Sequence, residues 1–161
     1  MKKKLLSLLL SLVMVVSLLP ASVFAANALV GRICFEFSGE YPPKQEIVDI
    51  FSSMSGGGGI AAAVVSVAVF APVAEEMFFR GLLYRIFKGF FSPFRCGALI
   101  SAVLSGALFA LMHADAFVFL PLSLMGVLLC MSYEKSGSII SPILVHALFN
   151  ARNLGIIWIA K

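Results

Sequence analysis

Two glutamates and an arginine lie within one apolar stretch of this sequence, in the segment EEMFFRG at positions 75–81. An ionised side chain at mid-bilayer depth costs about 2.5–3.5 kcal/mol on insertion scales, so this grouping needs a strong local reason. On a helix, Glu76 and Arg80 are spaced i,i+4 and can pair, whereas Glu75 points about 100° away from Glu76. The arginine can therefore neutralise Glu76 and leave Glu75 free for chemistry. A purely structural ion pair between packed helices fits the same stretch.

The two histidines of the chain, His113 and His146, both lie in hydrophobic surroundings that we predict to be helical. Phe109 and His113 are spaced i,i+4 and share a helix face, as do His146 and Asn150. Three helices could thus bring together a carboxylate, two imidazoles and an amide. A single buried histidine is more often a satisfied core residue, but two of them beside a buried acid pair favour a functional site.

This set of side chains predicts peptide-bond hydrolysis by an activated water. A glutamate in an apolar environment can act as general base toward water, and an imidazole can orient that water or protonate a leaving amine. Asn150 and a neutral histidine could donate hydrogen bonds to a developing oxyanion. Alternatively, Glu75, His113 and His146 could bind zinc and leave an open position for water, although the sequence contains no HExxH motif.

The composition indicates how these residues are positioned. Of the 161 residues, 61% are hydrophobic and only 12% are charged, which is typical of an integral membrane protein. The formal charge of +4 is small, and the basic residues sit at segment ends, as orientation signals do, rather than in a patch for nucleic acid. We predict an all-α, polytopic transmembrane helix bundle with about four core spans after an N-terminal hydrophobic leader. The predicted spans are 60–87, 97–114, 117–133 and 139–159.

The sequence divides into three predicted parts. Residues 1–26 have three lysines and an apolar run of about 15 residues, short of the about 20 that span a bilayer, and are read as a signal peptide or a signal-anchor helix. Residues 27–59 form a polar extracytoplasmic segment with a short amphipathic helix at 44–54 and a glycine-rich joint. Residues 60–161 form the core, in which 91–97 is expected to be an interfacial loop. The basic residues around that loop place it on the cytoplasmic side.

Three motifs of the core resemble those of a known family of enzymes. They are EExxxR at 75–80, FxxxH at 109–113 and HxxxN at 146–150, in this order and on separate predicted helices. They resemble the motifs of the CAAX prenyl protease and bacteriocin-processing (CPBP, or Abi) intramembrane proteases. Any one motif is weak, but all three together are specific.

The resemblance implies a membrane endopeptidase. In such an enzyme Glu75 activates water, assisted by His113, while His146 and Asn150 stabilise the oxyanion. Glu76 and Arg80, the other two residues of the first motif, support the site. The implied site residues are Glu75, Glu76, Arg80, His113, His146 and Asn150.

We therefore predict an intramembrane endopeptidase that acts on a membrane-associated peptide or protein in a bacterial cytoplasmic membrane. Eukaryotic-type members of the family cut prenylated CAAX proteins, and bacterial members are tied to bacteriocin maturation or self-immunity. The main alternative is a non-catalytic self-immunity protein that binds a peptide at the membrane. A small transporter or ion-binding bundle is a third hypothesis. Two matching halves of the sequence would support it, and the sequence shows no such symmetry.

Overall fold

The computed structural model describes residues 25–26, 28–40, 53–54 and 56–159. Within these residues every regular element is a helix and no strand occurs, in agreement with the predicted all-α class. The predicted leader and the predicted amphipathic helix at 44–54 lie almost entirely outside the described residues. The polar segment between them includes a helix at residues 28–38, which the sequence interpretation did not anticipate.

The core begins with one continuous helix of 34 residues, Gly57–Phe90. Its segments are α3 (Gly57–Val65), the π-helical η1 (Ser66–Phe70), α4 (Ala71–Glu76), the π-helical η2 (Met77–Leu83) and α5 (Tyr84–Phe90). After a turn come α6 (Gly97–Leu111), α7 (Phe119–Ser136) and α8 (Ile140–Ile159). The turn at 91–96 lies where the sequence predicted a loop, and its interfacial location stays a prediction.

Pro72 explains the first π-helical segment. Proline has no N–H to donate, so a regular helix loses a hydrogen bond wherever proline enters its interior. Here the Ala71 N–H donates to the Ser66 carbonyl five residues back, and Pro72 then stands at the start of α4. The helix therefore passes Pro72 with a widened turn. Such π turns are frequent at functional sites, and the second one carries Phe79 and Arg80 into the interior.

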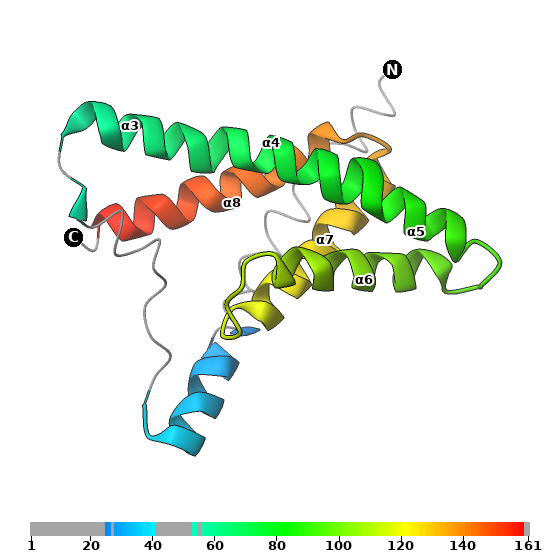
Figure 1. Cartoon of the computed structure of the whole chain (residues 1–161), viewed down its shortest axis with the longest axis horizontal. Coiled ribbons are helices and arrows are strands. Elements are labelled where there is room, and N and C mark those ends of the chain that lie inside the picture. The colour runs from blue at the N-terminus through cyan, green and yellow to red at the C-terminus, as the bar shows by residue number, and fades with distance from the viewer. Residues whose placement is uncertain (1–24, 27, 41–52, 55, 160–161) are drawn as a thin grey trace.

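The other helices pack along different parts of the long helix (Figure 1). Helix α8 contacts η1 and α4 in its first half, whereas α6 contacts α5 in its second half. Helix α7 packs against both α6 and α8. The middle of the long helix, where the acidic motif lies, is thus the region where all four helices meet.

Two glycines allow the closest of these contacts, between α6 and α7. A Cβ added to Gly126 would lie 2.5 Å from the Gly106 Cα, and one added to Gly106 would lie 2.7 Å from the Ser123 carbonyl oxygen. Close crossings of this kind are typical of membrane helices, because small residues let two backbones approach. The crossing brings the backbone of α7 near the acidic motif.

Two of the described helices are long and apolar enough to cross a membrane, Gly57–Phe90 and Ile140–Ile159. Helix α6 is apolar but shorter, so the predicted count of four spans stays a prediction. Large apolar side chains such as Phe70, Met77 and Leu111 are more than half exposed, while charged and hydroxyl side chains are buried between the helices. This apolar exterior suits a lipid environment.

Candidate active site

Glu76 and Arg80 form the predicted i,i+4 ion pair at the centre of the helix bundle. Both side chains are fully buried, and Arg80 Nη1 donates to Glu76 Oε1 at 2.7 Å. Arg80 Nη2 donates to the Gly126 carbonyl of α7 at 2.9 Å. The guanidinium also lies 5.0 Å from the Phe109 ring centre, within range of a cation–π contact. Glu76 is therefore neutralised by a cation that neighbouring helices hold in place.

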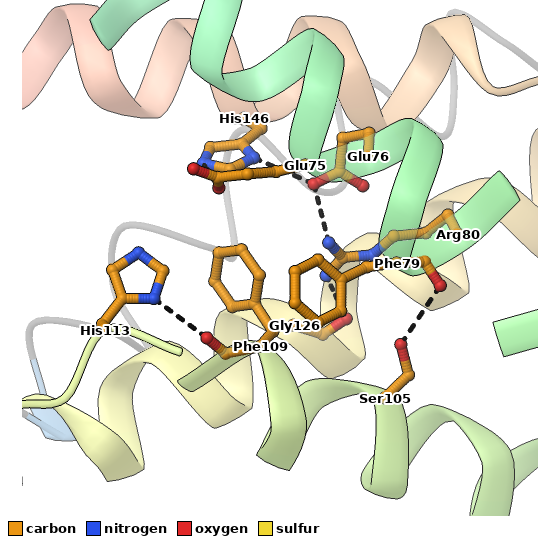
Figure 2. Close-up of polar contacts among 9 residues, drawn as sticks. All are labelled: Glu75, Glu76, Phe79, Arg80, Ser105, Phe109, His113, Gly126 and His146. Carbon is orange, nitrogen blue, oxygen red and sulfur yellow. Dashed lines mark hydrogen bonds and ion pairs between the residues drawn. The ribbon is translucent and has the colours of Figure 1, made fainter. Parts of the chain in front are cut away.

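His146 lies between the two glutamates of the motif (Figure 2). Its Nδ1 donates to Glu76 Oε1 at 2.9 Å, and its Nε2 lies 3.6 Å from Glu75 Oε2. His146 is 3% exposed, so the two carboxylates are linked through an imidazole that water hardly reaches. The Nδ1–H group of His146 is the donor of this hydrogen bond to Glu76. A neutral imidazole therefore has no proton on Nε2, the nitrogen that lies nearest to Glu75.

Glu75 differs from Glu76 in both exposure and pairing. Its side chain is 32% exposed, whereas that of Glu76 is fully buried. The Glu75 Oε2 atom itself is buried and accepts no hydrogen bond from the described part of the chain. Two atoms 3.6 Å apart can both contact one water molecule, so Glu75 Oε2 and His146 Nε2 have the spacing to hold a water between them.

His113 reaches the same region from the end of α6. The prediction of a helix to residue 114 was wrong here, because α6 ends at Leu111 and His113 lies in the turn that follows. The turn is tight: Ala114 has a φ of 51°, in the left-handed region that favours glycine. His113 Nδ1 donates to the Phe109 carbonyl at 2.9 Å, and its second nitrogen faces the side on which Glu75 and His146 lie (Figure 2).

Phe109 separates the two imidazoles. It is fully buried, and its ring centre lies 4.9 Å from that of His113 and 5.6 Å from that of His146. Its ring also meets Phe79 edge-on at 5.2 Å. The Phe109 ring thus packs against both imidazoles and limits their movement through ring contacts alone.

Asn150 contacts the long helix away from the two glutamates. Its Nδ2 donates to the Val67 carbonyl at 3.0 Å. This carbonyl needs an outside donor, because the Ala71 N–H donates to Ser66 and the next residue, Pro72, has no N–H. The amide that the sequence placed in the site therefore joins α8 to the widened turn in the described structure.

The zinc hypothesis does not fit the described geometry. No group of three His, Cys, Asp or Glu side chains among the described residues is arranged to hold a metal ion. Of the three predicted ligands, His146 directs Nδ1 to Glu76, and His113 lies on the other side of the Phe109 ring. We therefore derive no step through a metal.

The structure adds two contacts that the sequence interpretation missed. The Gly126 carbonyl accepts from Arg80, and Ser105 Oγ donates to the Phe79 carbonyl at 3.4 Å (Figure 2). Both involve backbone carbonyls whose position depends on the helix crossing, and no residue pattern indicates them. Ser105 is fully buried, and no serine of the chain lies in a GxSxG context, so a nucleophilic serine has no support.

The chain is similar to known proteins over most of its core. Residues 57–152 match the family described as type II CAAX prenyl endopeptidase Rce1-like, and this range includes every site residue named above. The UPF0177 protein YaiH of Lactococcus lactis subsp. lactis (strain IL1403) is 36% identical over 91 residues, which are 54% of this chain and 34% of that protein. The chain thus matches about a third of the length of this relative. No solved structure matches the chain. The match over more than half of its length shows that the chain belongs to the Rce1-like family of type II CAAX prenyl endopeptidases.

Proposed function

We propose that this protein is an intramembrane endopeptidase in which Glu75 activates the water that hydrolyses a peptide bond. The observation that carries the proposal is the contrast between the two adjacent glutamates. One oxygen of each carboxylate lacks a donor among the described residues. However, Glu76 is fully buried and its other oxygen is bonded to Arg80 and His146, whereas the Glu75 side chain is 32% exposed and forms no hydrogen bond with those residues. A general base needs such an uncommitted lone pair within reach of water.

In the reaction that we propose, Glu75 alone takes up and returns the one proton that is transferred. Glu75 Oε2 takes a proton from water as the hydroxyl oxygen attacks the peptide carbonyl carbon, giving a tetrahedral oxyanion. The C–N bond then breaks, and the leaving amine takes the proton back from Glu75. His146 Nε2 lies near enough to Glu75 Oε2 to orient the water, since Glu76 fixes the imidazole through Nδ1.

His113 is the second group that we assign to the reaction. Its Nδ1–H donates to the Phe109 carbonyl, so its other nitrogen is left to act on substrate. This nitrogen faces the side on which Glu75 and His146 lie (Figure 2), and with a proton on it, it would donate to the oxyanion. The Arg80 guanidinium is already paired with Glu76, so we assign it the role of holding Glu76, and through Glu76 the His146 imidazole, in place.

The substrate that we propose is a peptide or protein held at the membrane. Membership of a CAAX endopeptidase family supports a peptide substrate, and the two long apolar helices support a site within or beside the bilayer. We place the protein in a bacterial cytoplasmic membrane. The matched relative is a bacterial protein, which supports this location.

The test is cleavage of a quenched peptide library by the purified protein in detergent, with and without a chelator. The wild type is compared with Glu75→Gln and with Glu36→Gln, a matched substitution on the exposed helix at 28–38. We expect Glu75→Gln to lower kcat/KM by at least about 10²-fold, the lower range for loss of a general base, and Glu36→Gln to leave it unchanged.

The same three proteins separate the proposal from its alternative. Retained cleavage in Glu75→Gln would refute the assignment of Glu75. If the folded wild type binds peptides of the library but cleaves none, the protein is a peptide-binding membrane protein of the self-immunity kind. Cleavage that the chelator abolishes would show a metal requirement and overturn the metal-free mechanism.

A further inference from the structure

A polar pocket lies at the opposite end of α5 from the acidic motif, where the long helix turns into α6. Its volume is about 540 Å³. It is lined by residues of α5, of the turn at 91–96, of the start of α6 and of the last turns of α7. The lining residues that matter here are Arg85, Lys88, Arg95, Tyr133 and Glu134.

The pocket carries an excess of positive charge. Lys88 Nζ pairs with Glu134 Oε2 across the pocket, so these two charges cancel. Arg85 and Arg95 lie on different elements, one on α5 and one in the turn, and neither has an ion-pair partner among the residues that the structure describes. Two guanidinium groups therefore face one hollow without a protein counter-charge, which is an arrangement suited to a phosphate group.

The surroundings of the pocket favour a lipid as the source of that phosphate. The helices on both sides expose large apolar side chains to the outside: Leu82 and Ile86 before the turn and Leu99 after it are each more than half exposed. Phe90 and Phe94 at the turn are exposed as well. A phosphate in the pocket would thus lie at the polar edge of an apolar surface that can receive acyl chains. Basic pockets between membrane helices on the cytoplasmic side bind anionic head groups.

We propose that the pocket between Arg85, Arg95 and Tyr133 binds the phosphate of an anionic phospholipid head group from the cytoplasmic leaflet. The lipid would hold the turn at 91–96 at the membrane surface and so fix the start of α6. This proposal does not depend on catalysis by Glu75, because the pocket shares no residue with that site.

The experiment measures lipid binding to the full chain in a non-ionic detergent by isothermal titration calorimetry. The probes are short-chain phosphatidylglycerol, phosphatidylcholine of the same chain length, and inorganic phosphate. The variants are Arg85→Gln, Arg95→Gln, the double variant, and the charge-preserving double variant Arg85→Lys/Arg95→Lys. Lys135→Gln is the matched control, because it removes one positive charge from the last turn of α7 without touching the pocket lining.

We expect phosphatidylglycerol to bind at least about tenfold more tightly than phosphatidylcholine or inorganic phosphate. The double glutamine variant should weaken this binding by about tenfold or more, and the double lysine variant and Lys135→Gln by about threefold at most. Both arginines are exposed, so the variants should fold, and far-UV circular dichroism checks this. If the double variant fails to fold, the two single glutamine variants give the same comparison.

Three results would overturn the proposal. Equal binding of the two lipids would remove the role of the anionic head group. An effect of Lys135→Gln as large as that of either arginine variant would reduce the binding to general surface attraction. Inorganic phosphate binding as tightly as phosphatidylglycerol would make the pocket a site for free phosphate.

Discussion

Asn150 provides the most discriminating test, because its contact and its motif position predict different behaviour. In the structure its Nδ2 donates to the Val67 carbonyl at 3.0 Å. The family resemblance instead gives it a role at the oxyanion. If the main role of Asn150 is the contact with Val67, the loss of stability in an Asn150 variant must depend on Pro72. The Val67 carbonyl needs an outside donor because proline has no N–H.

The magnitude follows from the cost of an unsatisfied carbonyl. Asn150→Ala leaves the Val67 carbonyl without its donor, and such a group costs about 1–3 kcal/mol when buried. Hydrogen bonds between membrane helices average about 0.6 kcal/mol and reach about 1.7 kcal/mol. We therefore expect Asn150→Ala to lower the free energy of unfolding by about 1–2 kcal/mol. Pro72→Ala restores an N–H five residues after Val67, so in that background the loss should fall to about 0.5 kcal/mol or less.

The assay is a double-mutant cycle on four proteins: wild type, Pro72→Ala, Asn150→Ala and the double variant. Unfolding by sodium dodecyl sulfate in mixed micelles is followed by far-UV circular dichroism, and peptide cleavage is measured on the same samples. We expect a coupling of about 1 kcal/mol, above the about 0.3–0.5 kcal/mol within which independent sites are additive. We also expect partial recovery of cleavage in the double variant.

The reasoning would be refuted by additive losses of stability in the two backgrounds. A fall in kcat of about 10²–10³-fold in both backgrounds, with no recovery by Pro72→Ala, would show that Asn150 acts as an oxyanion donor, since loss of one such donor has this size. In that case the amide would have to turn from the Val67 carbonyl toward substrate.

Three further substitutions test the interior of the bundle by the same unfolding assay. Glu76→Gln should cost about 3–5 kcal/mol, because it leaves the buried guanidinium without its counter-charge; a loss below about 1 kcal/mol would contradict the buried pair. Gly126→Ala should cost about 1–3 kcal/mol and lower cleavage, because its Cβ would lie 2.5 Å from the backbone of α6. The control is Gly155→Ala, which should be neutral because nothing lies within 4 Å of the added Cβ. Ser132 and Ser141 are buried and share a hydrogen bond of 2.8 Å, so Ser132→Ala should cost about 0.5–1.5 kcal/mol, the net contribution of one hydrogen bond. No loss of stability would contradict the pairing.

The sequence predicted the helices well wherever the apolar stretch is long and its ends are marked. The long helix was expected at 60–87 and is observed at Gly57–Phe90, and the turn at 91–96 follows from Pro93 and Gly97. The end of α6 was misjudged, because the residues up to His113 are apolar and no proline or glycine marks the change. The chain turns there through a positive φ at Ala114, which no residue pattern indicates.

By itself, the sequence determined the helical class, the family and the pairing of Glu76 with Arg80. These depend on composition, motif order and the i,i+4 spacing within one helix, all of which can be read from the sequence without knowing how the helices pack. The partners of His146 and Asn150 were decided only by the tertiary structure. Each is a contact between α8 and the long helix, about 70 to 83 residues apart in sequence, and each depends on how α8 packs against the long helix. The difference in exposure between the two glutamates also comes from the tertiary structure. Both side chains have the same chemistry, and only the packing of α7 and α8 buries Glu76 and leaves Glu75 partly exposed.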